Sequence, residues 1–298
     1  MSKLRYLKYL IFSIFIFFFF YYFLTDDYTT WELPKAPRLP QRNKNMKYRI
    51  LTFFSKNHFD EALTSCQSLH SLPETKNWKY GTMVAYIHTD IPSRLLFKYS
   101  RLCPIVEIRR YNYSNLPKHI YKRLSTCAWK PIMLQKFMKE SNQFLYIDAS
   151  IVFQMEANDT IKSLFDSMNE FPCGIRDLQS VSHSVFSATH PQMLEYLNFR
   201  EEQAKNSEMV AGGLFVFSKT KQSQQIVDEW ADCAMTDGCI SPPGSQLYCD
   251  GNKLKNKEYA NCHRFDQSAL NILLYKCNPQ IDKIFRETDL IKVCRDGC

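Results

Sequence analysis

The clearest pattern of apolar and polar residues lies at residues 143–153, near the middle of the chain. There the apolar run FLYI leads directly into Asp148, and a second short run, IVF, follows Ser150. A continuous apolar run bounded by polar residues is typical of a strand buried on both faces, as in a parallel sheet. In open α/β sheets, ligands bind at the carboxyl ends of such strands. Asp148 is therefore a candidate binding residue, although an ordinary turn after a strand explains it equally well.

The same patterning predicts alternating strands and helices along most of the chain. Strands are expected over 48–54, 82–87, 104–108 and 171–177, and helices over 59–69, 92–99, 130–139, 190–199 and 223–235. Asp159 or Thr160 is a suitable cap for one further helix after the central strand. A β-α-β-α-β order predicts an α/β fold, with a mostly parallel, twisted sheet flanked by helices.

Two later segments contain residues whose type is unusual for their position. Residues 209–217, MVAGGLFVF, place Gly212 and Gly213 inside an apolar run. Such a pair marks a bulge, a close approach by a ligand or backbone, or tight packing under a neighbouring element, and the sequence leaves these open. Asp266 begins a helical pattern in residues 262–277, where an acid in the first turn also stabilises the helix dipole.

The N-terminal part combines an uncharged apolar stretch with a proline-rich stretch. Residues 9–24 carry no charge; three basic residues precede them and two aspartates follow them. No small-residue cleavage site follows, which favours an uncleaved transmembrane signal anchor over a cleaved signal peptide. The basic flank, residues 1–8, is expected to stay cytoplasmic and the rest of the chain to be lumenal. Three evenly spaced prolines predict an extended stem over 25–45, ahead of one domain at 46–298.

Composition and charge narrow the class of ligand. The chain of 298 residues is 45% apolar and 14% aromatic, enough to bury a sizeable core. Seven of its 38 basic and three of its 30 acidic side chains lie in residues 1–44, which leaves 31 and 27 in the remainder. A domain this mildly basic suits a small anionic ligand and argues against nucleic acid as a partner.

Eleven cysteines lie between Cys66 and Cys298, and none forms a CxxC pair. Zinc sites usually contain closely spaced ligand pairs, so a structural zinc is disfavoured, with Cys262 beside His263 as the remaining opening. An oxidising compartment with several disulfides, concentrated toward the C-terminus, explains the cysteines better. The odd number leaves one thiol free or paired between chains.

Short motifs add glycosylation sites and exclude common enzyme classes. Asn112 and Asn158 each begin an N-glycosylation sequon, which a lumenal domain would expose to the modifying enzyme. The sequence contains no P-loop, G-x-G-x-x-G, G-x-S-x-G or H-E-x-x-H motif. Their absence removes the commonest ATPase, dinucleotide-binding, serine-hydrolase and zincin interpretations.

Four short segments carry a resemblance to a known family. They are Ala128–Pro131 (AWKP), Tyr146–Ser150 (YIDAS), Ala211–Gly213 (AGG) and His263–Ser268 (HRFDQS). In order and spacing they resemble the type II membrane glycosyltransferases of the GT-A fold, and more narrowly a mainly nematode family of nucleotide-diphospho-sugar transferases. The resemblance covers about residues 48–277. It implies a single-pass type II protein of the Golgi or endoplasmic reticulum membrane.

The resemblance also implies roles for individual residues. Asp148 takes the place of the first acid of the D-x-D motif, which holds Mn²⁺ or Mg²⁺ with a nucleotide diphosphate. The third position of that motif is Ser150, a poorer metal ligand than a carboxylate, so metal dependence is in doubt. The leaving diphosphate needs positive charge, for which Lys130, His263 and Arg264 are candidates.

The same resemblance implies roles for Asp266, Gly212 and Gly213. Asp266 suits a base for an inverting enzyme or a sugar-orienting group for a retaining one. Gly212 and Gly213 would let the backbone approach the donor sugar or the acceptor. The sequence thus predicts a lumenal glycosyltransferase with a nucleotide-sugar donor and a glycan, protein or lipid acceptor. The alternatives are a catalytically inactive lumenal domain that binds glycans or a partner protein and, less favoured, a two-carboxylate glycoside hydrolase.

Overall fold

The computed structural model describes residues 48–295. The predicted cytoplasmic tail (1–8), transmembrane anchor (9–24) and stem (25–45) lie outside the described residues, as does Cys298. Among the helices of residues 48–295, none combines the length and apolar character that crossing a membrane requires.

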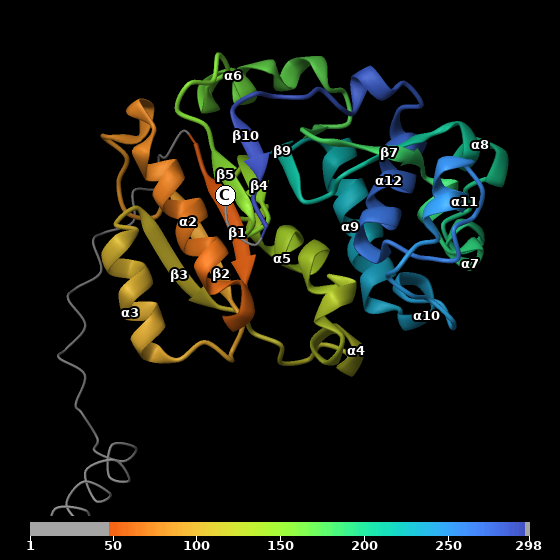
Figure 1. The fold of residues 1–298 in the computed structure, drawn as a ribbon, viewed down its shortest axis with the longest axis horizontal. Coiled ribbons are helices and arrows are strands. Elements are labelled where there is room, and N and C mark those ends of the chain that lie inside the picture. The colour runs from red at the N-terminus through yellow and green to blue at the C-terminus, as the bar shows by residue number, and fades with distance from the viewer. Residues whose placement is uncertain (1–47, 296–298) are drawn as a thin grey trace, which may run out of the picture. The chain divides into compact units, whose positions relative to one another are not determined.

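A six-stranded sheet with the order β3-β2-β1-β4-β9-β6 forms the centre of the fold (Figure 1). Its strands are β1 (Ile50–Phe54), β2 (Met83–Ile87), β3 (Val106–Arg110), β4 (Gln143–Ile147), β6 (Ile175–Asp177) and β9 (Leu214–Ser218). The β1–β2, β2–β3 and β1–β4 pairs are parallel, whereas β9 is antiparallel to β4 and to β6. The prediction of a mostly parallel α/β sheet is therefore confirmed, with β9 as the strand that runs the other way.

Two small antiparallel sheets complete the β structure. One pairs β5 (Ile151–Phe153) with β10 (Ile291–Val293), and the other pairs β7 (Ser180–Ser184) with β8 (Glu208–Val210). The apolar stretch at 143–153 is thus two strands, because the chain turns at residues 148–150 between β4 and β5. Figure 1 shows β10, in blue, beside β5 near the middle of the molecule.

Helices cover both faces of the central sheet. On one face lie α2 (Phe59–Ser71), α3 (Ser93–Leu102) and α6 (Ile161–Asp166); on the other lie α5 (Trp129–Phe137), α9 (Lys221–Met235) and α12 (Phe265–Cys277). Alternate strand residues point to opposite faces, so Leu51 and Phe53 join the core of the second group while Ile50 and Phe54 join that of the first. Figure 1 shows α2 and α3 over the β1–β3 half and α9 and α12 toward the other end of the sheet.

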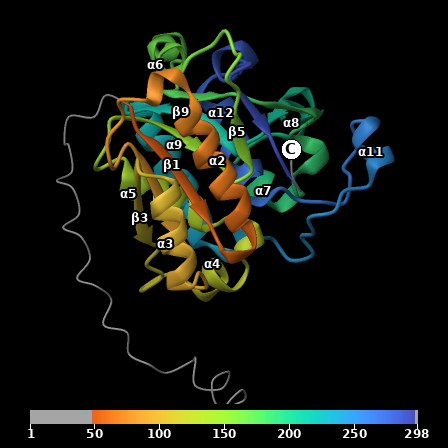
Figure 2. The ribbon, with the colours of Figure 1, turned by 60° about the vertical axis from the view of Figure 1, so that its left-hand side comes forward.

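Shorter helices and turns connect these layers. The helices are α4 (Lys118–Lys122), α7 (Pro191–Tyr196), α8 (Glu201–Asn206), α10 (Asp237–Ile240) and α11 (Gly251–Lys255). Short 3₁₀ turns occupy Lys56–His58, Pro73–Thr75, Leu124–Thr126, Ser167–Glu170, Phe186–Ala188 and Ile281–Lys283. Figure 2 shows α11 at the margin of the molecule, away from the central sheet.

Most predicted elements are found within a few residues of their expected bounds, and two differ instructively. The strand expected over 171–177 contains only residues 175–177, and the segment at 209–217 is divided into β8 and β9. The division falls at Ala211–Gly213, where Gly212 adopts a φ of +60° that a strand does not allow. Thr160, rather than Asp159, caps α6 by accepting a hydrogen bond from the Ser163 amide at 3.0 Å.

Disulfides join several of these elements, as the cysteine content predicts. The pairs are Cys66–Cys103, Cys173–Cys277, Cys233–Cys239 and Cys249–Cys262, and Cys294 is also disulfide-bonded. Cys127 is the free thiol within the described part of the chain. Because Cys262 is bonded to Cys249, the remaining opening for a zinc site beside His263 is closed.

Candidate functional site

A cleft of about 530 Å³ opens at the carboxyl ends of β1 and β4. Its walls come from the end of β1, the start of α2, the segment before α5, the turn at 148–150 and Arg295. This is the edge at which open α/β sheets bind their ligands. Asp148 and Ser150 both line it, as does the free thiol of Cys127.

The central feature of the site is a lysine held between two carboxylates. The Lys130 Nζ lies 2.9 Å from Asp266 Oδ2 and 3.4 Å from Asp148 Oδ1, and it donates to the Gly212 carbonyl at 3.1 Å. Three acceptors therefore face an ammonium group that has three N–H donors. Two acids from distant parts of the sequence are brought together by this arrangement.

Each of the three charged residues is placed by the end of a regular element. Asp148 directly follows β4, while Lys130 and Asp266 lie in the first turns of α5 and α12. The Tyr146 hydroxyl donates to Asp148 Oδ1 at 2.7 Å, and the Asp148 amide donates to the Gly213 carbonyl at 2.8 Å. The Asp148 side chain keeps 39% of its surface exposed, whereas that of Asp266 keeps 9%. Asp148 is thus the carboxylate that is more accessible from the cleft.

Burial and mutual attraction set the ionisation of this group. Burial opposes the charge on Lys130, but the carboxylates of Asp148 and Asp266 outweigh it and raise the pKa of Lys130 well above its ordinary value. Burial raises the pKa of Asp266 to about 6, although the lysine acts in the opposite direction. At neutral pH the lysine is therefore charged and Asp266 is mostly ionised.

The segment Ala211–Gly213 fits between the acids because two of its residues lack side chains. A Cβ on Gly213 would collide with Asp148 Oδ2, and a Cβ on Gly212 would lie 3.3 Å from Gln267. Of the explanations left open by the sequence, the structure shows close packing against neighbouring elements. This packing brings the Gly212 carbonyl to Lys130.

A second layer of polar residues, which the sequence analysis did not identify, holds this segment. The Gly212 amide donates to Asp177 Oδ2 at 3.0 Å, and burial raises the pKa of Asp177 to about 7. The Asn271 side chain accepts from the Val210 amide at 2.7 Å and donates to the Val210 carbonyl at 3.0 Å. Gln267 donates to that same carbonyl at 2.8 Å. Polar residues four positions apart on the otherwise apolar helix α12 were the signal that could have revealed Gln267 and Asn271.

His263 does not belong to this group, which corrects its assignment as a donor-binding residue. Its side chain is fully buried, and its Nδ1 accepts a hydrogen bond from the His190 amide at 3.1 Å. Burial lowers the pKa of His263 to about 3, so the ring is neutral and supplies no positive charge. The ring supports the loop ahead of α12 instead.

Trp129 lines the cleft, whereas Arg264 is not among its lining residues. Arg264 is half-buried directly before α12, and it forms no ion pair with any residue in the described range. The Trp129 ring stacks on Phe53, with 3.8 Å between ring centroids, and is largely buried. Trp129 is therefore part of the core wall.

The side chains around Asp148 do not fit a divalent cation. One Asp148 oxygen already receives the Tyr146 hydroxyl and faces Lys130, and the third position of the motif is the hydroxyl of Ser150. In the described part of the chain, no group of three or more His, Cys, Asp or Glu side chains is arranged to hold a metal. A fixed ammonium between the two acids would also repel Mn²⁺ or Mg²⁺.

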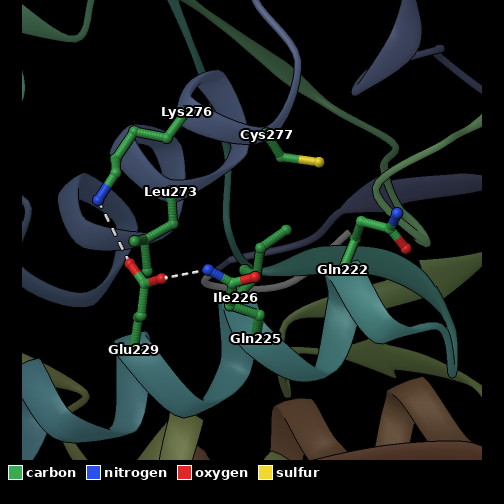
Figure 3. Close-up of a pocket in the computed structure, with 7 residues that line it drawn as sticks. All are labelled: Gln222, Gln225, Ile226, Glu229, Leu273, Lys276 and Cys277. Carbon is green, nitrogen blue, oxygen red and sulfur yellow. Dashed lines mark hydrogen bonds and ion pairs between the residues drawn. The ribbon is translucent and has the colours of Figure 1, made fainter.

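Other candidate sites lie elsewhere. Asn112 and Asn158 are both exposed, and the Asn158 amide group donates to Asp289 Oδ2 at 3.0 Å. A separate hollow of about 230 Å³ lies between α9 and α12 (Figure 3). There Glu229 accepts hydrogen bonds from Gln225 and Lys276. Asp148, Lys130 and Asp266 do not line this hollow. The cleft at Asp148 is consequently the site with candidate chemistry.

Comparison with known proteins found similarity to solved structures alone. No protein-family profile matches the sequence, and no curated protein sequence matches it. Several of the solved structures that resemble it are glycosyltransferases. Mouse xyloside xylosyltransferase 1 shares 12% identity over 80% of this chain and 84% of its own, with a TM-score of 0.45.

Two further solved structures resemble the chain to a similar degree. The galactosyltransferase LgtC, solved with donor and acceptor sugar analogues, shares 11% identity over 76% of this chain and 70% of its own, with a TM-score of 0.45. Core-mannan synthase A from Aspergillus fumigatus, in a Mn/GDP form, shares 10% identity over 68% of this chain and 67% of its own, with a TM-score of 0.44. Likeness at these values does not identify a donor, an acceptor or a reaction.

Proposed function

We propose that this protein is a glycosyltransferase of GT-A-like fold that uses a nucleotide-sugar donor. The observation that carries the proposal is the meeting of Asp148 and Asp266 on the Lys130 ammonium, beside a cleft at the carboxyl ends of β1 and β4. The acids come from segments more than a hundred positions apart. Asp148 lines the cleft, and the shielded Asp266 contacts the same lysine. Two carboxylates so placed suit a ligand that carries both hydroxyl groups and a leaving group.

The two acids have different tasks in this proposal. Asp148, which is more exposed, contacts the donor, and Asp266 acts at the sugar. In an inverting reaction, Asp266 takes the proton from the acceptor hydroxyl as its oxygen attacks the anomeric carbon and the diphosphate leaves with the bonding electrons. In a retaining reaction, Asp266 orients the sugar instead. Either task requires the ionised form, which Lys130 favours.

The acceptor would be a glycan, a protein or a lipid, met on the lumenal side of the Golgi or endoplasmic reticulum membrane. The apolar stretch at 9–24 supports a single-pass type II anchor, and the disulfides support an oxidising compartment. Asn112 and Asn158 would then be open to glycosylation.

The test is a donor panel of nucleotide sugars incubated with the purified full chain, with sugar transfer and donor hydrolysis both measured. Asp148→Asn and Asp266→Asn should each lower kcat by about 10²–10⁴-fold, because each removes a charged group at the reacting atoms. Their thermal unfolding should stay close to that of the unchanged protein. Asp232→Asn, at an exposed position of α9 whose side chain has no assigned contact, is the matched control and should leave kcat unchanged.

The pH profile gives a second test of the same assignment. Since burial raises the pKa of Asp266 to about 6 and the carboxylate is the active form, activity should fall as the pH is lowered through about 6. Absence of both transfer and donor binding across the panel would refute the proposal. Donor binding without turnover, unaffected by either substitution, would instead favour a catalytically inactive binding domain.

A further inference from the structure

Asp148, Asp266 and Lys130, together called the acidic cluster, lack the positive charge that the diphosphate of the proposed donor needs. A diphosphate leaving group gains negative charge as the glycosidic bond breaks, and this charge must be stabilised. Lys130 cannot supply the stabilisation alone, because its three N–H donors already face Asp148, Asp266 and the Gly212 carbonyl. With both acids ionised, the cluster of one lysine and two aspartates carries one net negative charge. An anionic ligand therefore needs additional cations near the Asp148 turn.

The end of the chain brings one such cation to this turn. Strand β10 pairs antiparallel with β5, with Val293 opposite Ile151, and the Cys294 amide donates to the Ser150 carbonyl at 2.6 Å. This register carries Arg295 to the turn at 148–150, and Arg295 lines the same cleft as Asp148 and Ser150. The disulfide at Cys294 adds a covalent link next to this arginine.

Arg264 adds a second cation from another element. It lies two positions before Asp266, at the start of α12. Burial and the like charge of Arg295 both lower the pKa of Arg264, so the two guanidinium groups lie within electrostatic reach of each other. Neither forms a salt bridge with an acid in residues 48–295. Arg295 lines the cleft, and Arg264 directly precedes the helix whose Asp266 lies 2.9 Å from the Lys130 Nζ. Two arginines so placed, without a carboxylate partner among the described residues, form an arrangement suited to a phosphate group.

We propose that Arg264 and Arg295 bind the diphosphate of the donor and supply the positive charge that a divalent cation supplies at a D-x-D site. Donor binding is then independent of metal. This inference rests on the proposed glycosyltransferase function and names the chemistry of its leaving-group site. The inference explains why the D-x-D-like turn ends in Ser150. A second acid at this position would help to bind a metal ion, and the arginines supply the positive charge of that ion instead. Together they add two positive charges to the one net negative charge of Lys130, Asp148 and Asp266.

The experiment is calorimetric titration of the full chain, kept in detergent because of the predicted anchor, with pyrophosphate, UDP and GDP. Each titration is run in EDTA and again in Mn²⁺. Binding should be seen in EDTA, and Arg264→Ala and Arg295→Ala should each weaken it by about tenfold or more, since each removes charge-assisted hydrogen bonds. Arg295→Lys should retain part of the affinity because it keeps the charge but loses the planar fork.

The matched control is Lys292→Ala, which removes an equally exposed positive charge three positions earlier, on β10. Its affinity should equal that of the unchanged protein. Arg295 is exposed, so its substitution tests binding with the core intact, and thermal unfolding checks this. Binding that appears only with Mn²⁺, or that survives both arginine substitutions unchanged, would overturn the inference while leaving the glycosyltransferase proposal in place. Failure of every probe in both conditions would defeat the glycosyltransferase proposal itself.

Discussion

Lys130 shows how one buried charge organises the residues around it. Its ammonium group keeps two carboxylates and the Gly212 carbonyl close together, although like charges at that separation would otherwise repel. Removing the lysine would be costly, because it would leave both carboxylates without an opposite charge, whereas removing either acid leaves the lysine paired with the other. The lysine therefore has a structural task as well as an electrostatic one at the cleft.

Gly213 permits a sharp test of this packing. In Gly213→Ala the new methyl group would collide with Asp148 Oδ2, and the half-exposed carboxylate would turn away from Lys130 toward solvent. We expect the thermal midpoint to change little and transfer activity to fall by about tenfold or more, in line with the effect of a misplaced catalytic group. Steady-state kinetics together with thermal unfolding measure the two effects.

The matched control is Gly238→Ala, because a Cβ at Gly238 meets no atom within 4 Å. This control should leave both activity and stability unchanged. Full activity in Gly213→Ala would show that the position of Asp148 relative to Lys130 is unimportant.

Single residues also show the limits of prediction from sequence. Asp148 and Asp266 were identifiable because each follows or begins a clear apolar pattern. His263 was misassigned, since a histidine in a polar stretch resembles a surface residue, whereas here the ring is buried and forms hydrogen bonds with the backbone of His190 and Ile240. Asp177 ends the strand predicted over 171–177, as Asp148 follows its own strand, but its hydrogen bond with Gly212, 35 positions away, could not be inferred from the sequence.

At the scale of elements, α12 links the site to the core. Asp266 in its first turn faces Lys130, while Asn271, one turn later, binds both backbone groups of Val210 at the end of β8. The helix thus positions the Asp266 carboxylate and the glycine segment 211–213 with the same rigid unit. Side chains are held in position more precisely on a helix than on a loop.

The substitution Asn271→Ala measures how much the contact between α12 and Val210 of β8 contributes to stability. In Asn271→Ala the buried Val210 amide loses its acceptor, so the free energy of unfolding should fall by about 1–3 kcal/mol. Asn252→Ala on the exposed helix α11 is the control, with an expected change within about 0.5 kcal/mol. Urea denaturation provides both values. Equal stabilities of the two variants would contradict the anchoring role of Asn271.

The elements themselves were predictable to different extents. Strands with four or more consecutive apolar residues, such as β4, and amphipathic helices such as α9 were apparent from periodicity. Strands β5, β7, β8 and β10 were harder, because three of them contain only three residues and too few positions to show a period. Arg295 reaches the cleft lined by Asp148 because of β10, so this part of the site could not be inferred from local pattern.

At the scale of the whole molecule, the proposed lumenal position makes a clear prediction. Asn112 and Asn158 are exposed, so the protein made in a eukaryotic cell should carry N-glycans at both. Treatment with an amide-cleaving glycosidase should increase its mobility on a gel in two resolvable steps. Asn112→Gln and Asn158→Gln should each remove one step, and the double variant should remove both. An unmodified protein would contradict the lumenal proposal.

The disulfides have a practical consequence for making this protein. Four disulfides cross-link helices and connecting segments of the described fold, and one of them spans 104 positions between Cys173 and Cys277. A bacterial cytosol keeps thiols reduced, so recombinant chains made there would lack these cross-links during folding. Secretion from yeast or insect cells, with disulfide isomerases available, is the suitable route to material for the assays above.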